Sequence, residues 1–173
     1  MTDGLVLPPG AGTKIQNMTL KVGAEQSTIW SAFEADVAPG FDVGAHLHAE
    51  AEEVFYVLDG ELDLLAFHPV GRADGDWRSW ESASGATTHR GGPGSFMFVP
   101  AGCPHAFSNP GPEPARMLFL VSPAGHEIYL RELGELLGRG GPPDPEAIAA
   151  LRLRHDIQQL TALTTRPPAA PRH

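Results

Sequence analysis

The chain has 173 residues, with 12 basic and 21 acidic side chains and a formal net charge of −9. This acidity argues against nucleic acid as a partner, because phosphate backbones would be repelled. The single cysteine excludes an intrachain disulfide, no run approaches the roughly 20 apolar residues of a membrane helix, and the N-terminus shows no signal peptide, so we expect a cytoplasmic protein with no membrane contact.

Short strands between glycine- and proline-rich turns are predicted for the first part of the chain. Residues 1–14 are expected to form an N-terminal arm, and residues 27–37 alternate between two faces as a half-buried strand does. The dipeptide Asp59-Gly60 suits the positive φ of a tight primed turn and predicts a hairpin between its flanking segments. The other strands expected in this part are 18–22, 46–48, 53–58 and 61–66.

Residues 68–93 break this rhythm and predict a long loop or an extra hairpin. Short strands return at 95–99, 105–108 and 115–121. Residues 128–137 then show helical spacing that Gly138 ends, and Asp144 before Pro145 predicts the start of a second helix. One or two further turns would pack against the sheet through Ile148, Leu151 and Leu160, and the tail 166–173 is expected to fray. The fold class is therefore all-β with a C-terminal helical appendix, built as a jelly roll or similar barrel.

Four side chains form a candidate metal site. His46 and His48 are two residues apart and point to the same face of a strand. Glu53 can join them after a turn over residues 49–52, and His105 follows the segment Pro100-Ala101-Gly102. Three imidazole nitrogens and one carboxylate are a donor set for a divalent transition metal, with Fe, Mn, Ni, Co, Cu and Zn all compatible.

At these residues the chain resembles the cupin superfamily. The first cupin motif is matched by Gly40, His46, His48, Glu53 and Gly60, and the second by Gly94, Pro100, Gly102, His105 and Asn109. The resemblance implies one cupin domain over residues 1–173, with a cupin-type jelly-roll β-barrel over 15–122 and helices over 123–165. It also implies the metal ligands His46, His48, Glu53 and His105. Glu52 is a rival carboxylate, but the motif's six-residue spacing to Gly60 selects Glu53.

The C-terminal part is similar in composition to small single-barrel cupins of the quercetin-dioxygenase-like subgroup. This likeness implies a metal-dependent enzyme for a small phenolic, enolizable or polyketide-like molecule, with a dioxygenase as the first expectation and dioxygen as co-substrate. Glu53 would then also act as a base toward the substrate. Two alternatives stay open: a non-redox cyclase, isomerase or lyase, and a non-catalytic small-molecule-binding cupin. By family analogy we expect a homodimer.

Strand parity assigns provisional roles to the neighbours of these ligands. Phe55, Val57 and Phe107 are candidates for substrate-pocket walls, with plain core packing as the alternative, whereas Tyr56 should point away. Cys103 is interpreted as a small buried side chain. Trp77 and Trp80 would form a lid over the barrel mouth, or else a mobile sticky surface or dimer contact. Surface positions are expected for the histidines outside the motifs: His68, His89, His126, His155 and His173.

Overall fold

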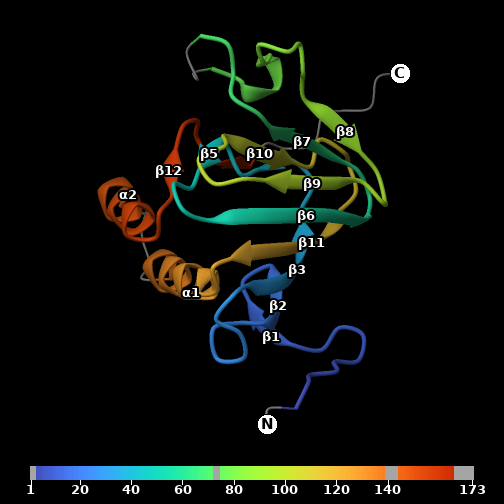
Figure 1. Ribbon diagram of the computed structural model, residues 1–173, viewed down its shortest axis with the longest axis vertical. Coiled ribbons are helices and arrows are strands. Elements are labelled where there is room, and N and C mark those ends of the chain that lie inside the picture. Colours follow the sequence, from blue (N-terminus) through green and yellow to red (C-terminus); the bar gives the residue numbers. More distant parts are fainter. Residues whose placement is uncertain (1–2, 72–74, 139–143, 166–173) are drawn as a thin grey trace.

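Two antiparallel sheets form the body of the protein in a computed structural model that describes residues 3–71, 75–138 and 144–165 (Figure 1). The six-stranded sheet has the order β1 (Thr13–Ile15), β2 (Met18–Val22), β3 (Ser31–Val37), β11 (Ala115–Ser122), β6 (Glu52–Asp59) and β9 (Phe96–Val99). The second sheet has the order β12 (Gln158–Gln159), β5 (His46–Leu47), β10 (His105–Ser108), β4 (Phe41–Asp42) and β13 (Thr164–Thr165), with β7 (Leu62–Ala66) on β10 and β8 (His89–Gly91) on β7. The all-β expectation is confirmed.

Aromatic rings fill the space between the sheets. The Phe55 and Phe119 rings stack with centroids 4.8 Å apart, Phe33 stacks on Phe119 at 5.6 Å, and Phe107 lies 5.7 Å from Phe55. These side chains come from β6, β11, β3 and β10, so both sheets contribute to one core. Burial of such rings supplies the main driving force for closing the barrel.

The turn at Asp59-Gly60 exists, but the predicted hairpin was wrong. Gly60 has φ 74°, and a Cβ there would lie 2.8 Å from the Ala115 Cα, so only glycine fits. The strands on either side do not pair: β6 lies between β11 and β9, whereas β7 pairs with β10 and β8 in the other sheet. Burial on both sides of β7 favours this crossover over a simple hairpin, because Leu64 faces the main core and Leu65 faces a second cluster.

A strand was expected over residues 27–37, but the observed strand β3 begins four residues later, at Ser31. The Ser27 hydroxyl accepts hydrogen bonds from the backbone N–H groups of Ile29 and Trp30, at 3.2 and 3.3 Å. This local turn competes with extended structure, and the strand begins only at Ser31.

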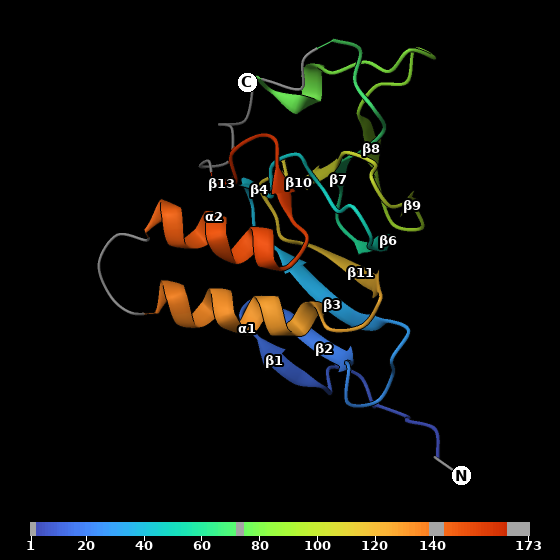
Figure 2. The same ribbon diagram turned by 60° about the vertical axis from the view of Figure 1, so that its left-hand side comes forward.

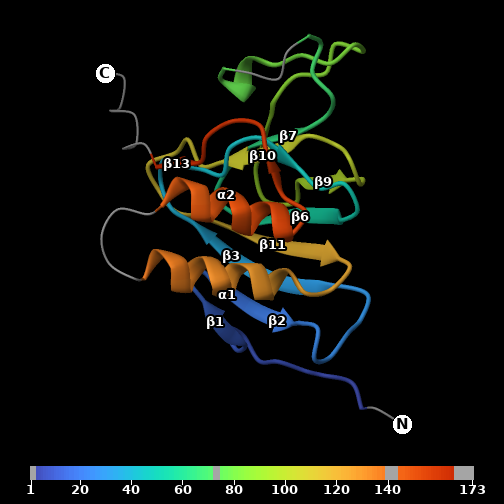
Figure 3. The ribbon, with the colours of Figure 1, turned by 90° about the vertical axis from the view of Figure 1, so that its left-hand side faces the viewer.

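Two helices follow the barrel strands and lie side by side (Figures 2 and 3). Helix α1 (His126–Leu137) ends at Gly138, and α2 (Pro145–Arg154) begins after Asp144, whose carboxylate accepts the Glu146 N–H. Both helix ends match the predicted signals. None of the described helices has the length and apolarity needed to cross a membrane. The tail 166–173 lies outside the described residues.

The chain after α2 departs from the expected further helical turns. Asp156 has φ 57°, which ends the helix, and β12 and β13 then pair with β5 and β4. These strands have two residues each, too few for a periodic pattern in the sequence. The C-terminal segment thereby adds two short strands to the sheet that carries His46.

Within the segment 68–93, the residues around Trp77 and Trp80 pack on the outside of the second sheet rather than forming a loose lid. The segment contains a short 3₁₀ helix, η1 (Trp77–Ser79), and Trp77 and Trp80 are 2% and 6% exposed. They pack in a cluster with Ala45, Leu65 and Ala106. The interpretations of these two tryptophans as a lid, a mobile sticky surface or a dimer contact were wrong, because the outer face of a short barrel strand also requires cover.

Candidate metal centre

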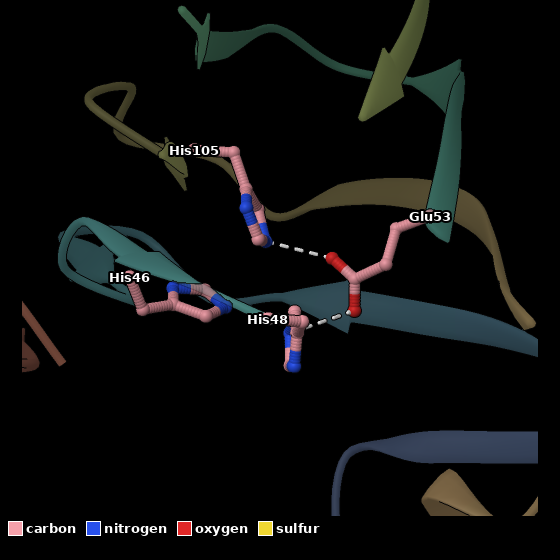
Figure 4. Close-up of side chains that lie close together, drawn as sticks. All are labelled: His46, His48, Glu53 and His105. Carbon is pink, nitrogen blue, oxygen red and sulfur yellow. Dashed lines mark ion pairs between the residues drawn. The ribbon is translucent and has the colours of Figure 1, made fainter. Parts of the chain in front are cut away.

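Four buried side chains converge at one end of the barrel interior (Figure 4). One ligand atom from each of His46, His48, Glu53 and His105 lies within 4.8 Å of the others. Two ligands on opposite sides of a zinc-like ion would be about 4.2 Å apart, since metal–nitrogen and metal–oxygen bonds are close to 2.1 Å. The widest separation is slightly larger than this span, so the four predicted residues are brought together at nearly the dimensions of a single-ion site.

Strand pairing places these side chains. His105 on β10 stands directly opposite His46 on β5, and their rings have centroids 4.2 Å apart. Glu53 comes from β6 in the other sheet, so the cluster bridges the two sheets. The Gly102 N–H donates to the His48 carbonyl at 2.6 Å, with Gly102 at φ 79°. This bond explains why the second motif needs a glycine there: the turn before His105 holds the backbone of His48.

All three imidazoles are held through the nitrogen that faces away from the cluster. The Nδ1 atoms of His46, His48 and His105 bond to backbone carbonyls of Gly44, Asp156 and Cys103, at 3.0, 2.9 and 3.2 Å. A carbonyl oxygen can only accept, so each Nδ1 carries the proton. In the neutral rings each Nε2 therefore presents a lone pair toward the cluster, the tautomer that a metal requires.

The contacts between these nitrogens and Glu53 are short but lack hydrogen-bond geometry. His105 Nε2 lies 2.7 Å from Glu53 Oε2, and His48 Nε2 lies 3.2 Å from Glu53 Oε1. Among the described residues, His48 Nε2, His105 Nε2 and Glu53 Oε2 are buried without a hydrogen-bond partner. Lone pairs this close repel each other unless a proton or a cation lies between them. The arrangement thus fits a metal ion.

Electrostatics of the cluster keeps Glu53 ionised. Burial alone would raise the pKa of Glu53, but the close approach of the His105 and His48 rings, at 2.7 and 3.2 Å, holds that pKa well below its usual range. Burial lowers the pKa of His46 to about 3, with His105 adding to the effect. Burial also acts to lower the pKa of His48, yet the Glu53 carboxylate raises it above its ordinary value. A carboxylate anion beside a neutral His46 is the protonation pattern of a cation site.

A hollow of about 200 Å³ adjoins the cluster on the side of α1. His48 contributes to its wall, together with His126 and Tyr129 of α1 and with His155 and Asp156 after α2. Surface positions were predicted for His126 and His155. The prediction was wrong for His126, whereas the His155 side chain is 22% exposed and pairs with Glu132 at 3.4 Å. His126 is partly buried, its ring centroid lies 6.2 Å from that of His48, and burial lowers its pKa to about 4. His68 and His89 are exposed as predicted, and His173 lies outside the described residues.

Asp156 is a further contributor that the sequence did not reveal. Its carboxylate accepts the N–H groups of Ala49 and Glu50 at 2.9 and 2.8 Å, while its carbonyl accepts His48 Nδ1. One residue of the C-terminal segment thereby fixes both the turn before Glu53 and the orientation of a ligand histidine.

The predicted pocket walls lie in the core. Phe55, Val57 and Phe107 are 2%, 1% and 6% exposed, and the Phe55 ring lies 6.1 Å from His105. Their packing supports the alternative of core residues behind the ligands, and the hollow beside His48 is lined by other side chains. Cys103 is buried as predicted, and burial raises the pKa of its thiol. Tyr56 is 39% exposed and faces away from the cluster.

A small β-barrel of two antiparallel sheets whose buried cluster of three histidines and one carboxylate could hold a metal ion is typical of one class of barrel proteins. The family model described as Cupin matches residues 9–131. The chain therefore belongs to the cupin family. No curated protein shows a significant match.

Three solved structures to which this chain is similar have low sequence identity to it. The cupin domain of Schizosaccharomyces pombe Cnp3 is 18% identical, with 76% of each chain covered and a TM-score of 0.48. The DMSP lyase DddQ from Ruegeria pomeroyi is 24% identical, with 62% of this chain and 46% of that chain covered and a TM-score of 0.44. A point mutant of Bacillus subtilis oxalate decarboxylase OxdC is 20% identical, with 62% of this chain and 26% of that chain covered and a TM-score of 0.47.

Proposed function

We propose that the protein is a metal-dependent cupin enzyme of the quercetin-dioxygenase-like subgroup. It would hold one divalent transition metal on His46, His48, Glu53 and His105 and act as a dioxygenase on a small phenolic, enolizable or polyketide-like molecule. The observation that supports the metal is the set of converging Nε2 and carboxylate atoms without hydrogen bonds, each ring locked through Nδ1. Such preorganised donors are costly unless a ligand binds.

When bound, the metal would supply Lewis acidity and, for a redox-active ion, a route for electrons to dioxygen. The chain's own contribution centres on Glu53. Its ionised carboxylate can accept the proton of an acidic hydroxyl or α-carbon of the substrate. Both atoms of dioxygen would enter the substrate, which is itself the reductant, so the reaction needs no further electron donor.

Elemental analysis of protein purified without added metal tests the site. We expect about one divalent transition metal per chain, and a loss of that metal in His48→Ala. His68→Ala, at an exposed histidine outside the cluster, serves as the matched control and should keep the full content. Equal metal content in His48→Ala and wild type would refute the assignment.

Oxygen dependence tests the reaction class. Flavonols and β-diketones, supplied to iron-loaded protein in air, should be consumed together with dioxygen, and consumption should stop without oxygen. Full turnover by zinc-loaded protein in the absence of oxygen would instead establish Lewis-acid chemistry and overturn the dioxygenase assignment.

We also propose that the protein is a cytoplasmic homodimer. Support for self-association comes from the outer face of the six-stranded sheet, where Tyr56, Phe96 and Phe98 are 39%, 63% and 50% exposed and β9 is the edge strand. Light scattering should give twice the monomer mass for wild type and the monomer mass for Phe98→Glu. A monomeric wild type would refute the dimer.

A further inference from the structure

The hollow beside His48 has a distinctive charge. It is enclosed by the start of α1, the end of β11 and the turn before Glu53. Among the described residues its lining includes no lysine or arginine, but it includes the carboxylates of Glu50 and Asp156. The nearest arginine in sequence, Arg154, is paired with Glu132 at 2.6 Å. A site of this kind repels added negative charge from any molecule that reaches the metal through it.

Two polar aromatic side chains in the hollow have no hydrogen bond to the described protein. The His126 and Tyr129 rings contact each other with centroids 5.5 Å apart, and Tyr129 also contacts the His155 ring at 5.6 Å. Phe119 packs against His126 at 5.5 Å and fixes that ring from the core side. The polar atoms of His126 and Tyr129 are thus free for a ligand, and their faces suit an aromatic or cationic group.

We propose that this hollow is the substrate subsite next to the metal, that His126 is its hydrogen-bonding contact, and that it admits small uncharged or cationic organic molecules while disfavouring phosphorylated and polycarboxylate ones. The inference rests on the proposed metal centre and adds the charge class of its substrate. The hollow's volume of about 200 Å³ is below the roughly 300–1,000 Å³ of pockets for drug-sized ligands, so it limits the ligand to about one aromatic ring with short substituents.

Three catechols provide probes that share a metal-chelating head and differ in the charge of the substituent. These are 4-methylcatechol, dopamine with an ammonium group, and protocatechuate with a carboxylate. Each would be titrated into the full chain loaded with Co²⁺, without oxygen and at low ionic strength, and followed by the cobalt absorption bands. Each dissociation constant would be divided by the constant for free Co²⁺, which removes the intrinsic difference between the catechols. We expect protocatechuate to bind about three- to tenfold more weakly than the other two.

A matched pair of charge variants locates the effect. Glu50 lines the hollow and Glu52 does not, although both are exposed and only two residues apart. Glu50→Lys should invert the preference in favour of protocatechuate, whereas Glu52→Lys, with the same change in net charge, should leave the order unchanged. Equal effects of the two substitutions would show that only the net charge matters and would overturn the subsite.

His126 is tested by a second series with the same readout. His126→Ala should weaken all three catechols about five- to tenfold at unchanged cobalt content, and His126→Asn, which restores a hydrogen-bonding group, should recover part of the loss. Unchanged affinity in His126→Ala would refute its role. Failure of wild type to bind cobalt would refute the metal centre itself, so the cobalt content separates the two failures.

Discussion

The two faces of the second sheet carry polar clusters of opposite chemistry. On the inner face, His105 Nε2 and Glu53 Oε2 lie 2.7 Å apart without hydrogen-bond geometry. On the outer face, the Trp77 indole N–H donates to Asp42 at 2.9 Å, and Arg78 donates to the same carboxylate at 2.8 Å. Polar atoms satisfied by the protein indicate a structural role, whereas converging buried atoms left unsatisfied indicate a place for a ligand.

The sharpest test of this contrast compares one substitution on each face: the outer one should lower stability, and the inner one should lower metal affinity. Trp77→Ala removes a fully buried indole and should lower the free energy of unfolding by about 3–5 kcal/mol, while metal content of the folded protein stays at about one per chain. His105→Gln nearly conserves volume and should lower metal affinity at least about 100-fold, with a change of less than about 1.5 kcal/mol in the metal-free protein. Urea unfolding after metal removal and elemental analysis measure the two quantities.

Trp30→Ala is the control for the tryptophan, because Trp30 is 40% exposed and its loss should change stability little. If Trp77→Ala released the metal from folded protein, or His105→Gln kept it, the two faces would not be separable in function.

The outer face offers a second comparison, between two arginines that contact Asp63. Arg78 bridges the buried Asp42 and Asp63, and its side chain is 27% exposed, whereas Arg90 forms an ion pair with Asp63 and is 54% exposed. Arg78→Gln leaves the Asp42 carboxylate without its charged partner and should cost about 2–3 kcal/mol. Arg90→Gln should cost less than about 1 kcal/mol, since an exposed pair is screened by water. Equal costs, measured by urea unfolding, would contradict this account of the network.

The metal ligands could be predicted because their types are scarce and their spacing reflects strand geometry. His46 and His48 share a strand face by parity, and the turns at Gly60 and Gly102 have positive φ, so each fixed position has a local physical cause. Asn109 has one as well, since its side chain donates to the Val37 and Glu113 carbonyls and accepts the Gly111 N–H.

The wall of the hollow could not be predicted, because it depends on contacts between residues far apart in sequence. His126 has no partner at a fixed spacing, and Asp156 reaches the turn before Glu53 across 107 residues for Ala49 and 106 for Glu50. In the pairing of β11 with β6, Val121 stands opposite Glu53, so the chain that leaves β11 emerges at the metal end. This register is itself a long-range pairing, so His126 could not be assigned from the sequence.

In the metal-free protein, the buried histidines His46 and His126 should make the free energy of unfolding sensitive to acid. Burial lowers the pKa values of His46 and His126 to about 3 and about 4, against an unfolded value of 6.5. A lowered folded pKa means that the stabilisation is complete above pH 6.5 and is lost as the pH falls toward the folded pKa. Between pH 7 and 5, each such group should cost about 2 kcal/mol.

His126→Gln measures the contribution of His126 to this loss of stability without replacing a metal ligand. Urea unfolding of metal-free protein at pH 7 and pH 5 should show a drop about 2 kcal/mol smaller in His126→Gln than in wild type. His48, whose pKa is raised, acts in the opposite direction in both proteins. An identical pH dependence in both would show that His126 is not desolvated in the folded state.

Asp156 contributes both to the protein's own hydrogen bonds and to the orientation of a metal ligand. Of the substitutions expected to weaken metal binding, its replacement should have the smallest effect. Its carboxylate is saturated by N–H groups of the turn, while its carbonyl orients the ring of His48. Asp156→Ala should weaken metal binding about tenfold, because the turn before Glu53 and the His48 ring lose their common support. Asp156→Asn should lose less, since asparagine tolerates the φ of 57° and retains one side-chain acceptor.

Asp144→Ala, which removes the cap of α2, is the control and should lower stability by about 1 kcal/mol with unchanged metal affinity. A competition titration with a chromophoric chelator measures these affinities, and wild-type affinity in Asp156→Ala would show that the barrel strands alone orient His48.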